Sequence, residues 1–173
     1  MLKCVFFDRD GIVNEPPPDR WVRRWADFRL MPAFVDVLST VRRRGYAAVL
    51  VSNQRGISLG VMTREAVEEI HRNLANDLKT RFGLDLLDML YCPHGERECD
   101  CRKPQPGMLL EAARRHDIDL AASWMVGDQE RDIEAGRRAG CRTILVSVAA
   151  AGTKADFKGK DMAELNALLE RVL

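Results

Sequence analysis

Residues 2–14 read LKCVFFDRDGIVN, an apolar run that ends in two acidic residues and a glycine. A short run that is apolar throughout is typical of a strand buried on both faces of a sheet. Gly11 allows the chain to turn sharply directly after Asp8 and Asp10. The segment therefore predicts a buried strand over residues 2–7 whose carboxyl end presents two carboxylates.

The rest of the chain alternates between apolar strands and amphipathic helices. Further strands are predicted over residues 46–52, 86–91, 123–127 and 143–148, and helices over residues 33–44, 64–81, 106–116, 129–139 and 161–172. Gly159 and two lysines interrupt the pattern near residues 155–157 and leave a last strand open. Strands that alternate with helices indicate a Rossmann-like α/β fold, with a parallel sheet covered by helices on both faces. We expect one domain over residues 1–173.

Composition excludes several classes of protein. Of the 173 residues, 46% are hydrophobic and 31% charged, and 27 basic residues against 26 acidic ones leave a net charge of +1. This balance gives no bulk attraction to nucleic acid or to a membrane surface. No apolar run approaches the roughly 20 residues of a membrane-spanning helix, and the first run is too short for a signal peptide. We expect a cytoplasmic protein with neither nucleic-acid nor membrane partners.

Polar side chains follow four of the predicted strands. The carboxyl ends of parallel strands meet at one edge of a sheet, so these side chains are expected to lie together. They are Asp8 and Asp10, Ser52 and Asn53, Arg102 and Lys103, and Asp128 and Asp132. Clustered carboxylates raise one another's pKa, and Mg²⁺ relieves that repulsion. A hydroxyl, backbone N–H groups and a lysine beside the cation fit a phosphoryl group, so the pattern favours phosphoryl transfer.

Together these motifs resemble those of the haloacid dehalogenase-like phosphohydrolases. The motifs are DRDG, SNQ, CRKPQPGM and GDQERD, and the resemblance extends over residues 4–148. Asn14 after DRDG, the extended motif SNQRGI and a Cys/His loop narrow it to one branch. That branch contains the D-glycero-D-manno-heptose 1,7-bisphosphate 7-phosphatases and the histidinol-phosphate phosphatases.

The resemblance implies a role for each acidic motif residue. Asp8 is expected to be the nucleophile and to form an aspartyl-phosphate, which divides the hydrolysis into two steps. Asp10 is expected to protonate the leaving oxygen and then to take a proton from water. Mg²⁺ is expected between the Asp8 carboxylate, the Asp10 carbonyl and the Asp128 carboxylate. Asp132 is expected to support the site without touching the metal.

The resemblance also implies the groups that bind the substrate. Ser52 and the Asn53 amide are expected to bind the transferring phosphoryl group, Lys103 to neutralise it, and Arg102 to hold the substrate. Gln129 departs from the lysine often found at this position in the heptose branch, which leaves a contact there open.

These roles predict a monomeric, Mg²⁺-dependent phosphatase of a small sugar phosphate, removing the 7-phosphate of heptose bisphosphate. Histidinol phosphate is the alternative substrate. A phospho-acceptor signalling domain is an alternative of another class, and so is a zinc-stabilised binding module with a decayed site. Asp10 argues against a signalling domain because it supplies the acid and base that hydrolysis needs. The intact motif residues argue against decay.

A second group of metal ligands lies before the lysine motif. Cys92, His94, Cys99 and Cys101 supply three thiolates and an imidazole, a complete tetrahedral set for a structural Zn²⁺. Such a site would order the loop that carries Arg102 and Lys103. The alternatives are a loop with fortuitous cysteines or a redox pair at Cys99 and Cys101.

Two further predictions concern residues outside the motifs. Residues 20–29, RWVRRWADFR, hold four arginines and two tryptophans. They either form a flap that binds a distal phosphate with help from Arg55, or a basic surface turn whose tryptophans pack in the core. His71 and His116 lie in predicted helices without ligand-like neighbours and are predicted to be surface residues.

Overall fold

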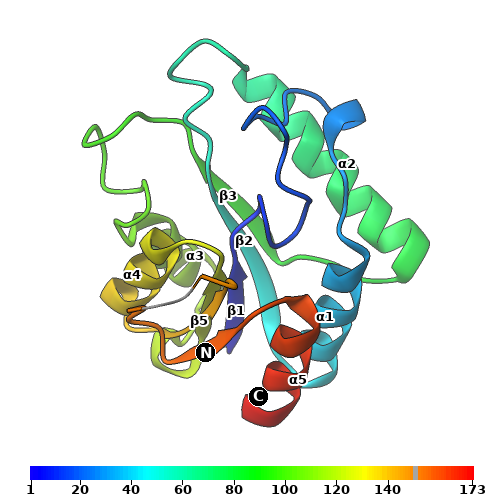
Figure 1. Ribbon diagram of the computed structural model, residues 1–173, viewed down its shortest axis with the longest axis vertical. Helices are drawn as coiled ribbons and strands as arrows, with labels where there is room; N and C mark the ends of the chain where they lie inside the picture. The colour runs from blue at the N-terminus through cyan, green and yellow to red at the C-terminus, as the bar shows by residue number, and fades with distance from the viewer. Residues whose placement is uncertain (150–151) are drawn as a thin grey trace.

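A computed structural model of the protein describes residues 1–149 and 152–173 and contains a six-stranded sheet (Figure 1). The strands are β1 (Cys4–Phe7), β2 (Ala47–Asn53), β3 (Asp88–Cys92), β4 (Trp124–Gly127), β5 (Arg142–Val146) and β6 (Phe157–Gly159). Their order is β3-β2-β1-β4-β5-β6, and each neighbouring pair is parallel. The predicted α/β fold with a parallel sheet is confirmed.

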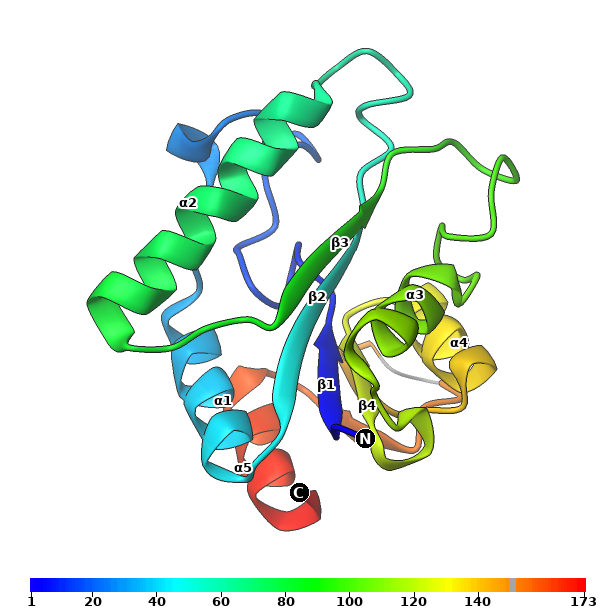
Figure 2. The same ribbon diagram turned by 180° about the vertical axis from the view of Figure 1, so that it is seen from behind.

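Helices cover both faces of this sheet. They are α1 (Pro32–Arg43), α2 (Arg64–Phe82), α3 (Gly107–His116), α4 (Glu130–Ala139) and α5 (Met162–Val172), with short 3-10 turns η1 (Trp25–Asp27) and η2 (Leu120–Ala122). Helices α1 and α5 lie side by side on one face, and α3 and α4 lie on the other (Figures 1 and 2). Alternate residues of β1 supply both layers: Val5 and Phe7 pack in the core under α1 and α5, and Phe6 packs in the core under α3 and α4.

Local signals in the sequence account for the ends of the longest helix. The Thr63 hydroxyl accepts a hydrogen bond of 3.1 Å from the backbone N–H of Ala66, which caps α2 at its first turn. Gly83 ends the same helix with a φ of +67°, a conformation that costs a glycine little.

The open question about a last strand is answered by β6. Asp156 precedes this strand, and its Oδ2 accepts hydrogen bonds from the backbone N–H and the hydroxyl of Thr143, at 2.7 and 2.9 Å. The Thr143 hydroxyl in turn accepts one from the backbone N–H of Asp156. These contacts dock a short, polar edge strand whose own sequence lacks an apolar run.

The prediction that His71 lies at the surface is wrong. His71 is only 6% exposed, because it shares the buried face of α2 with Val67, Ile70 and Leu74. Burial, with the neighbouring Arg9 cation, lowers the pKa of His71 to about 3, so the imidazole is neutral at physiological pH. His116 is half-buried, with its Nε2 2.8 Å from Asp88 Oδ2.

No helix in the described parts of the chain is both long and apolar enough to cross a membrane.

Candidate active site

The loops at the carboxyl edge of the sheet bring the motif residues together. Asp8 follows β1, Ser52 lies near the end of β2, and Asp128 follows β4, so all three lie at the edge of the sheet formed by the carboxyl ends of these parallel strands. Carboxylate oxygens of Asp8, Asp128 and Asp132 lie within 4.8 Å of one another. The sequence-based expectation that the strand ends would meet here is confirmed for these residues.

Lys103 forms the buried centre of this cluster. Its side chain is 1% exposed, and its ammonium donates hydrogen bonds to Asp8 Oδ1 at 2.7 Å and to the Val51 carbonyl at 2.8 Å. The same Nζ forms an ion pair of 2.8 Å with Asp132 Oδ1. Burial by itself would lower the pKa of Lys103, but the two carboxylates raise it above its ordinary value. The group is therefore a permanent cation beside Asp8.

The remaining negative charge fits a divalent cation. Burial and the adjacent Asp132 carboxylate raise the pKa of Asp8 to about 6, although Lys103 opposes the rise. Burial and Asp8 likewise raise the pKa of Asp128. Asp132 is already occupied, because its other oxygen accepts a 3.1 Å hydrogen bond from the Gln129 N–H. The carboxylates of Asp8 and Asp128 could therefore hold Mg²⁺, a hard ion that prefers such oxygens.

Close packing fixes Asp128 against the turn after β1. Gly11 has a φ of +91°, and a Cβ at this position would lie 2.4 Å from Asp128 Oδ2. Both the backbone conformation and the available space therefore require glycine here.

Asp10 is held by three neighbouring side chains. The buried Arg9 guanidinium reaches both Asp10 carboxylate oxygens, at 3.1 and 3.2 Å from Nη2. Asn14 donates to Oδ1 at 3.0 Å, and Gln54 donates to Oδ2 at 3.3 Å. These contacts fix the orientation of the carboxylate that the sequence assigns to acid and base work.

Gln54 also connects Asp10 to the end of β2, because its Nε2 donates a 2.7 Å hydrogen bond to the buried Ser52 hydroxyl. The side chain of Asn53 instead binds the backbone of Lys103, accepting from its N–H and donating to its carbonyl, each at 3.0 Å. A contact between Asn53 and a phosphoryl group would therefore have to use the backbone N–H of Asn53. Its side chain positions the lysine.

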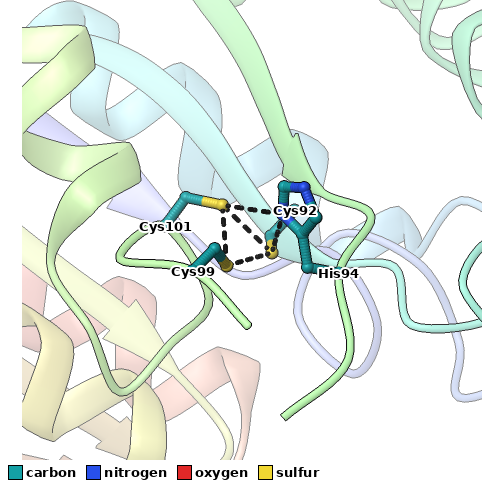
Figure 3. A group of neighbouring side chains, drawn as sticks. All are labelled: Cys92, His94, Cys99 and Cys101. Carbon is teal, nitrogen blue, oxygen red and sulfur yellow. Dashed lines mark hydrogen bonds between the residues drawn. The ribbon is translucent and has the colours of Figure 1, made fainter. Parts of the chain in front are cut away.

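The Cys/His loop forms the second predicted metal site (Figure 3). Cys92, His94, Cys99 and Cys101 point toward one another, with separations of 3.2–3.6 Å between the sulfurs and His94 Nδ1. Ligands about 2.3 Å from a tetrahedral zinc lie roughly 3.8 Å apart, close to these values. The sulfur separations are far longer than a disulfide bond of about 2.05 Å, so the cysteines are not paired. The four side chains fit Zn²⁺.

Arg102 and Gln129 flank the site. The Arg102 guanidinium donates a 3.3 Å hydrogen bond to the carbonyl of His94, which ties it to the Cys/His loop. The Gln129 amide lies 3.4 Å from Asp128 Oδ2, as a donor to that carboxylate.

Three of the four arginines of residues 20–29 are bonded to residues within or directly beside this segment. Arg23 pairs with Asp19, Arg24 with Asp27, and Arg29 with the carbonyls of Ala26 and Phe28. Trp25 stacks on Phe28 with 5.0 Å between ring centroids, and both pack against the core. Arg55 pairs with Glu96 at 3.1 Å. These contacts favour the structural alternative for this segment over a phosphate-binding flap.

Two residues of the site were not singled out from the sequence. Arg9 lies between Asp8 and Asp10 in the chain, and the alternation of side chains along a strand would point it to the opposite face. In the structure its long side chain instead folds back and contacts Asp10. Gln54 lies beyond the last predicted strand residue, where periodicity says nothing about direction. Both side chains are buried, and Gln54 reaches from the end of β2 to Asp10 after β1, a contact that spacing along the chain does not reveal.

Comparisons with known proteins agree with this geometry. A family model described as HAD-hydrolase-like matches residues 100–164. A D-glycero-alpha-D-manno-heptose-1,7-bisphosphate 7-phosphatase of Photorhabdus laumondii is 35% identical over 147 residues, covering 80% of this chain and 79% of its own length. A D-glycero-beta-D-manno-heptose-1,7-bisphosphate 7-phosphatase of the same organism is 38% identical over 142 residues, covering 78% of this chain and 74% of its own length.

A solved structure extends the likeness to the whole fold. The crystal structure of the D,D-heptose 1,7-bisphosphate phosphatase from B. bronchiseptica, complexed with magnesium and phosphate, superposes with a TM-score of 0.86 at 30% identity. The match covers 97% of this chain and 98% of that one.

Proposed function

Since the chain belongs to the haloacid dehalogenase-like phosphatases, we propose that it removes the 7-phosphate from D-glycero-D-manno-heptose 1,7-bisphosphate. The observation that carries the proposal is the buried contact between Lys103 Nζ and Asp8 Oδ1 at 2.7 Å, with Asp10 held two residues away. A nucleophile, an acid and base and a fixed cation are the groups that phosphomonoester hydrolysis requires. The relatives named for this substrate support the choice of sugar phosphate.

In the first step the Asp8 carboxylate attacks the phosphorus atom. A bond forms between the carboxylate oxygen and phosphorus, the bond from phosphorus to the sugar oxygen breaks, and Asp10 transfers a proton to that oxygen. Lys103 and the Ser52 hydroxyl stabilise the charge on the transferring group, because both are fixed before the reaction begins.

In the second step water hydrolyses the aspartyl-phosphate. Asp10, now ionised, takes a proton from the water as its oxygen bonds to phosphorus, and the Asp8 carboxylate leaves. Arg9 and Gln54 keep Asp10 in place for both proton transfers. Asp10 is again protonated at the end, so the cycle closes on the starting enzyme.

Two metal ions complete the proposal. Asp8 and Asp128, with the Asp10 carbonyl, would hold Mg²⁺, and the ion would supply positive charge to the phosphoryl oxygens. Cys92 and the three other residues of its loop would hold a structural Zn²⁺ that fixes Arg102 and Lys103. We also propose that the enzyme is a cytoplasmic monomer, and light scattering on the purified protein tests its mass in solution.

The assay that tests the function measures phosphate release with Mg²⁺ from a panel of substrates. The panel contains both anomers of heptose 1,7-bisphosphate, histidinol phosphate, fructose 1,6-bisphosphate and a nucleoside monophosphate. We expect kcat/KM for one heptose bisphosphate to exceed the others by about a hundredfold or more, equivalent to roughly 3 kcal/mol of discrimination. Slow and equal turnover across the panel would refute the heptose assignment, and a preference for histidinol phosphate would establish the alternative substrate. A stable phosphoryl-enzyme without turnover would indicate a phospho-acceptor domain.

A further inference from the structure

A cavity of about 390 Å³ opens beside Lys103, between helix α4 and the loop of residues 96–105, which includes the second half of the Cys/His loop. The loop arches over the side of the molecule that carries α3 and α4 (Figure 1). Four arginines from these two elements line the cavity: Arg97, Arg102, Arg131 and Arg138. We call this set of side chains the arginine cavity.

The positive charge of the arginine cavity is only partly compensated. Arg138 pairs with Glu134 and donates to the side chain of Gln105 at 3.0 Å. Among the residues that the structure describes, Glu96 is the one acidic residue that lines the cavity, and it is paired with Arg55. Within residues 1–149 and 152–173, neither Arg97 nor Arg131 has a hydrogen bond or an ion pair through its guanidinium group. Their charge is available to a ligand.

The arginine cavity lies next to the reacting groups. Arg131 is in the first turn of α4, three residues after Asp128. Burial and Asp8 raise the pKa of Asp128, and the Arg131 guanidinium is close enough to oppose that rise. Arg102 and Lys103, which also line the cavity, are consecutive in the chain, and Lys103 contacts Asp8 directly. A ligand in the cavity is therefore adjacent to a substrate whose scissile phosphate lies at Asp8.

The arginine cavity also contrasts with residues 20–29, for which the sequence left open a role in binding a distal phosphate. The guanidinium groups of Arg23 and Arg24 are paired with the nearby acidic residues Asp19 and Asp27. At position 129 the expected lysine is missing, and the glutamine there donates to Asp128 instead. Arg131, two residues further on, offers the positive charge that position 129 does not.

We propose that the arginine cavity binds the second anionic group of the substrate, a phosphate remote from the scissile one, through Arg97 and Arg131. A guanidinium group binds a phosphate through two parallel hydrogen bonds, so these two residues would distinguish bisphosphates from monophosphates. The inference rests on the proposed function and names the residues that determine its specificity.

The test compares kcat/KM for heptose 1,7-bisphosphate with kcat/KM for p-nitrophenyl phosphate, which has no second phosphate. We expect Arg97→Gln and Arg131→Gln each to lower the ratio of the two values by about tenfold or more, mainly through KM of the bisphosphate. Arg24→Gln is the matched control, since it removes an exposed arginine that is paired outside the cavity. The ratio should stay unchanged in that variant.

An unchanged ratio in both cavity variants, or an equal fall in Arg24→Gln, would overturn the proposal. A wild-type enzyme inactive on every substrate would instead refute the proposed function. The inference then still has its own test: calorimetric binding of the bisphosphate to Asp8→Asn, with and without Arg131→Gln. We expect the affinity to fall at least tenfold with the second substitution, and equal affinities would overturn the cavity assignment whatever the turnover.

Discussion

Asp8→Asn should stabilise the Mg²⁺-free protein while abolishing turnover. Burial and Asp132 raise the pKa of Asp8 from its ordinary 3.8 to about 6, so the folded protein binds a proton more tightly here than the unfolded chain. The stability from this group is complete below pH 3.8 and is lost as the pH rises through 6. The loss corresponds to about 3 kcal/mol. A neutral asparagine removes that cost and can still accept a hydrogen bond from Lys103.

We therefore expect the free energy of unfolding of Asp8→Asn to exceed that of the wild type by up to about 3 kcal/mol at pH 8. At pH 5 the difference should be roughly half as large. For a chain of this size the larger value raises Tm by roughly 6–12 °C. Thermal and urea unfolding in buffer without Mg²⁺, but with zinc retained, measure both values. Added Mg²⁺ should reduce the difference, because it stabilises the wild-type carboxylate.

The matched control is Asp10→Asn, which should have the opposite sign. Arg9 is only 1% exposed and rests on Asp10, so a neutral partner leaves a buried guanidinium poorly compensated, at a cost of about 1–2 kcal/mol. An Asp8→Asn variant no more stable than the wild type at pH 8 would refute the reasoning that burial and Asp132 raise the pKa of Asp8. Equal stabilisation by both variants would show that the effect is not specific to Asp8.

Four further substitutions test other parts of the site. Lys103→Met leaves Asp8 and Asp132 buried without their cation, and urea unfolding should show a loss of about 3–5 kcal/mol unless the acids take up protons. Gly11→Ala places a Cβ against Asp128, so kcat should fall at least tenfold and the Mg²⁺ needed for half-maximal activity should rise. Gln54→Leu frees the Ser52 hydroxyl and one oxygen of Asp10, and we expect kcat to fall by about tenfold, or about 1.4 kcal/mol, in phosphate release. Cys99→Ser should lower the bound zinc per chain, measured by elemental analysis, together with Tm; full zinc occupancy would contradict the assigned ligand set.

Much of the fold follows from the sequence because its signals are local. The apolar run of β1 and the cap residues of α2 can be recognised without reference to a distant residue. The parallel direction of the strands follows from the alternation of strands and helices along the chain. Strand β6 is different, since Phe157–Gly159 has no apolar run of its own and its pairing with β5 is accompanied by contacts between distant residues, such as Asp156 with Thr143. His71 could have been placed correctly, because it falls at the helical spacing of Val67 and Leu74.

Some parts of the site can likewise be predicted from the sequence, and others depend on three-dimensional contacts. The positions of Asp8, Ser52 and Asp128 follow from the rule that functional side chains gather at the carboxyl ends of parallel strands. The sequence does not specify the conformations of long side chains. It therefore could not predict that the Arg9 guanidinium contacts Asp10, or that four arginines line one cavity.

Asp8 is proposed to carry the phosphoryl group during turnover, and this intermediate can be detected directly. Asp10→Asn should slow the hydrolysis of the aspartyl-phosphate, because it removes the base that takes a proton from water. p-Nitrophenyl phosphate is a suitable substrate for this variant, because its leaving group needs little help from an acid. The most direct measurement mixes the Asp10→Asn variant with p-nitrophenyl phosphate and Mg²⁺ and quenches the reaction with acid. Mass spectrometry of the peptide that contains Asp8 then detects the phosphoryl group. We predict one added phosphoryl group on Asp8. A phosphoryl group on another residue, or none while phosphate is still released, would refute the assignment of Asp8 as the nucleophile.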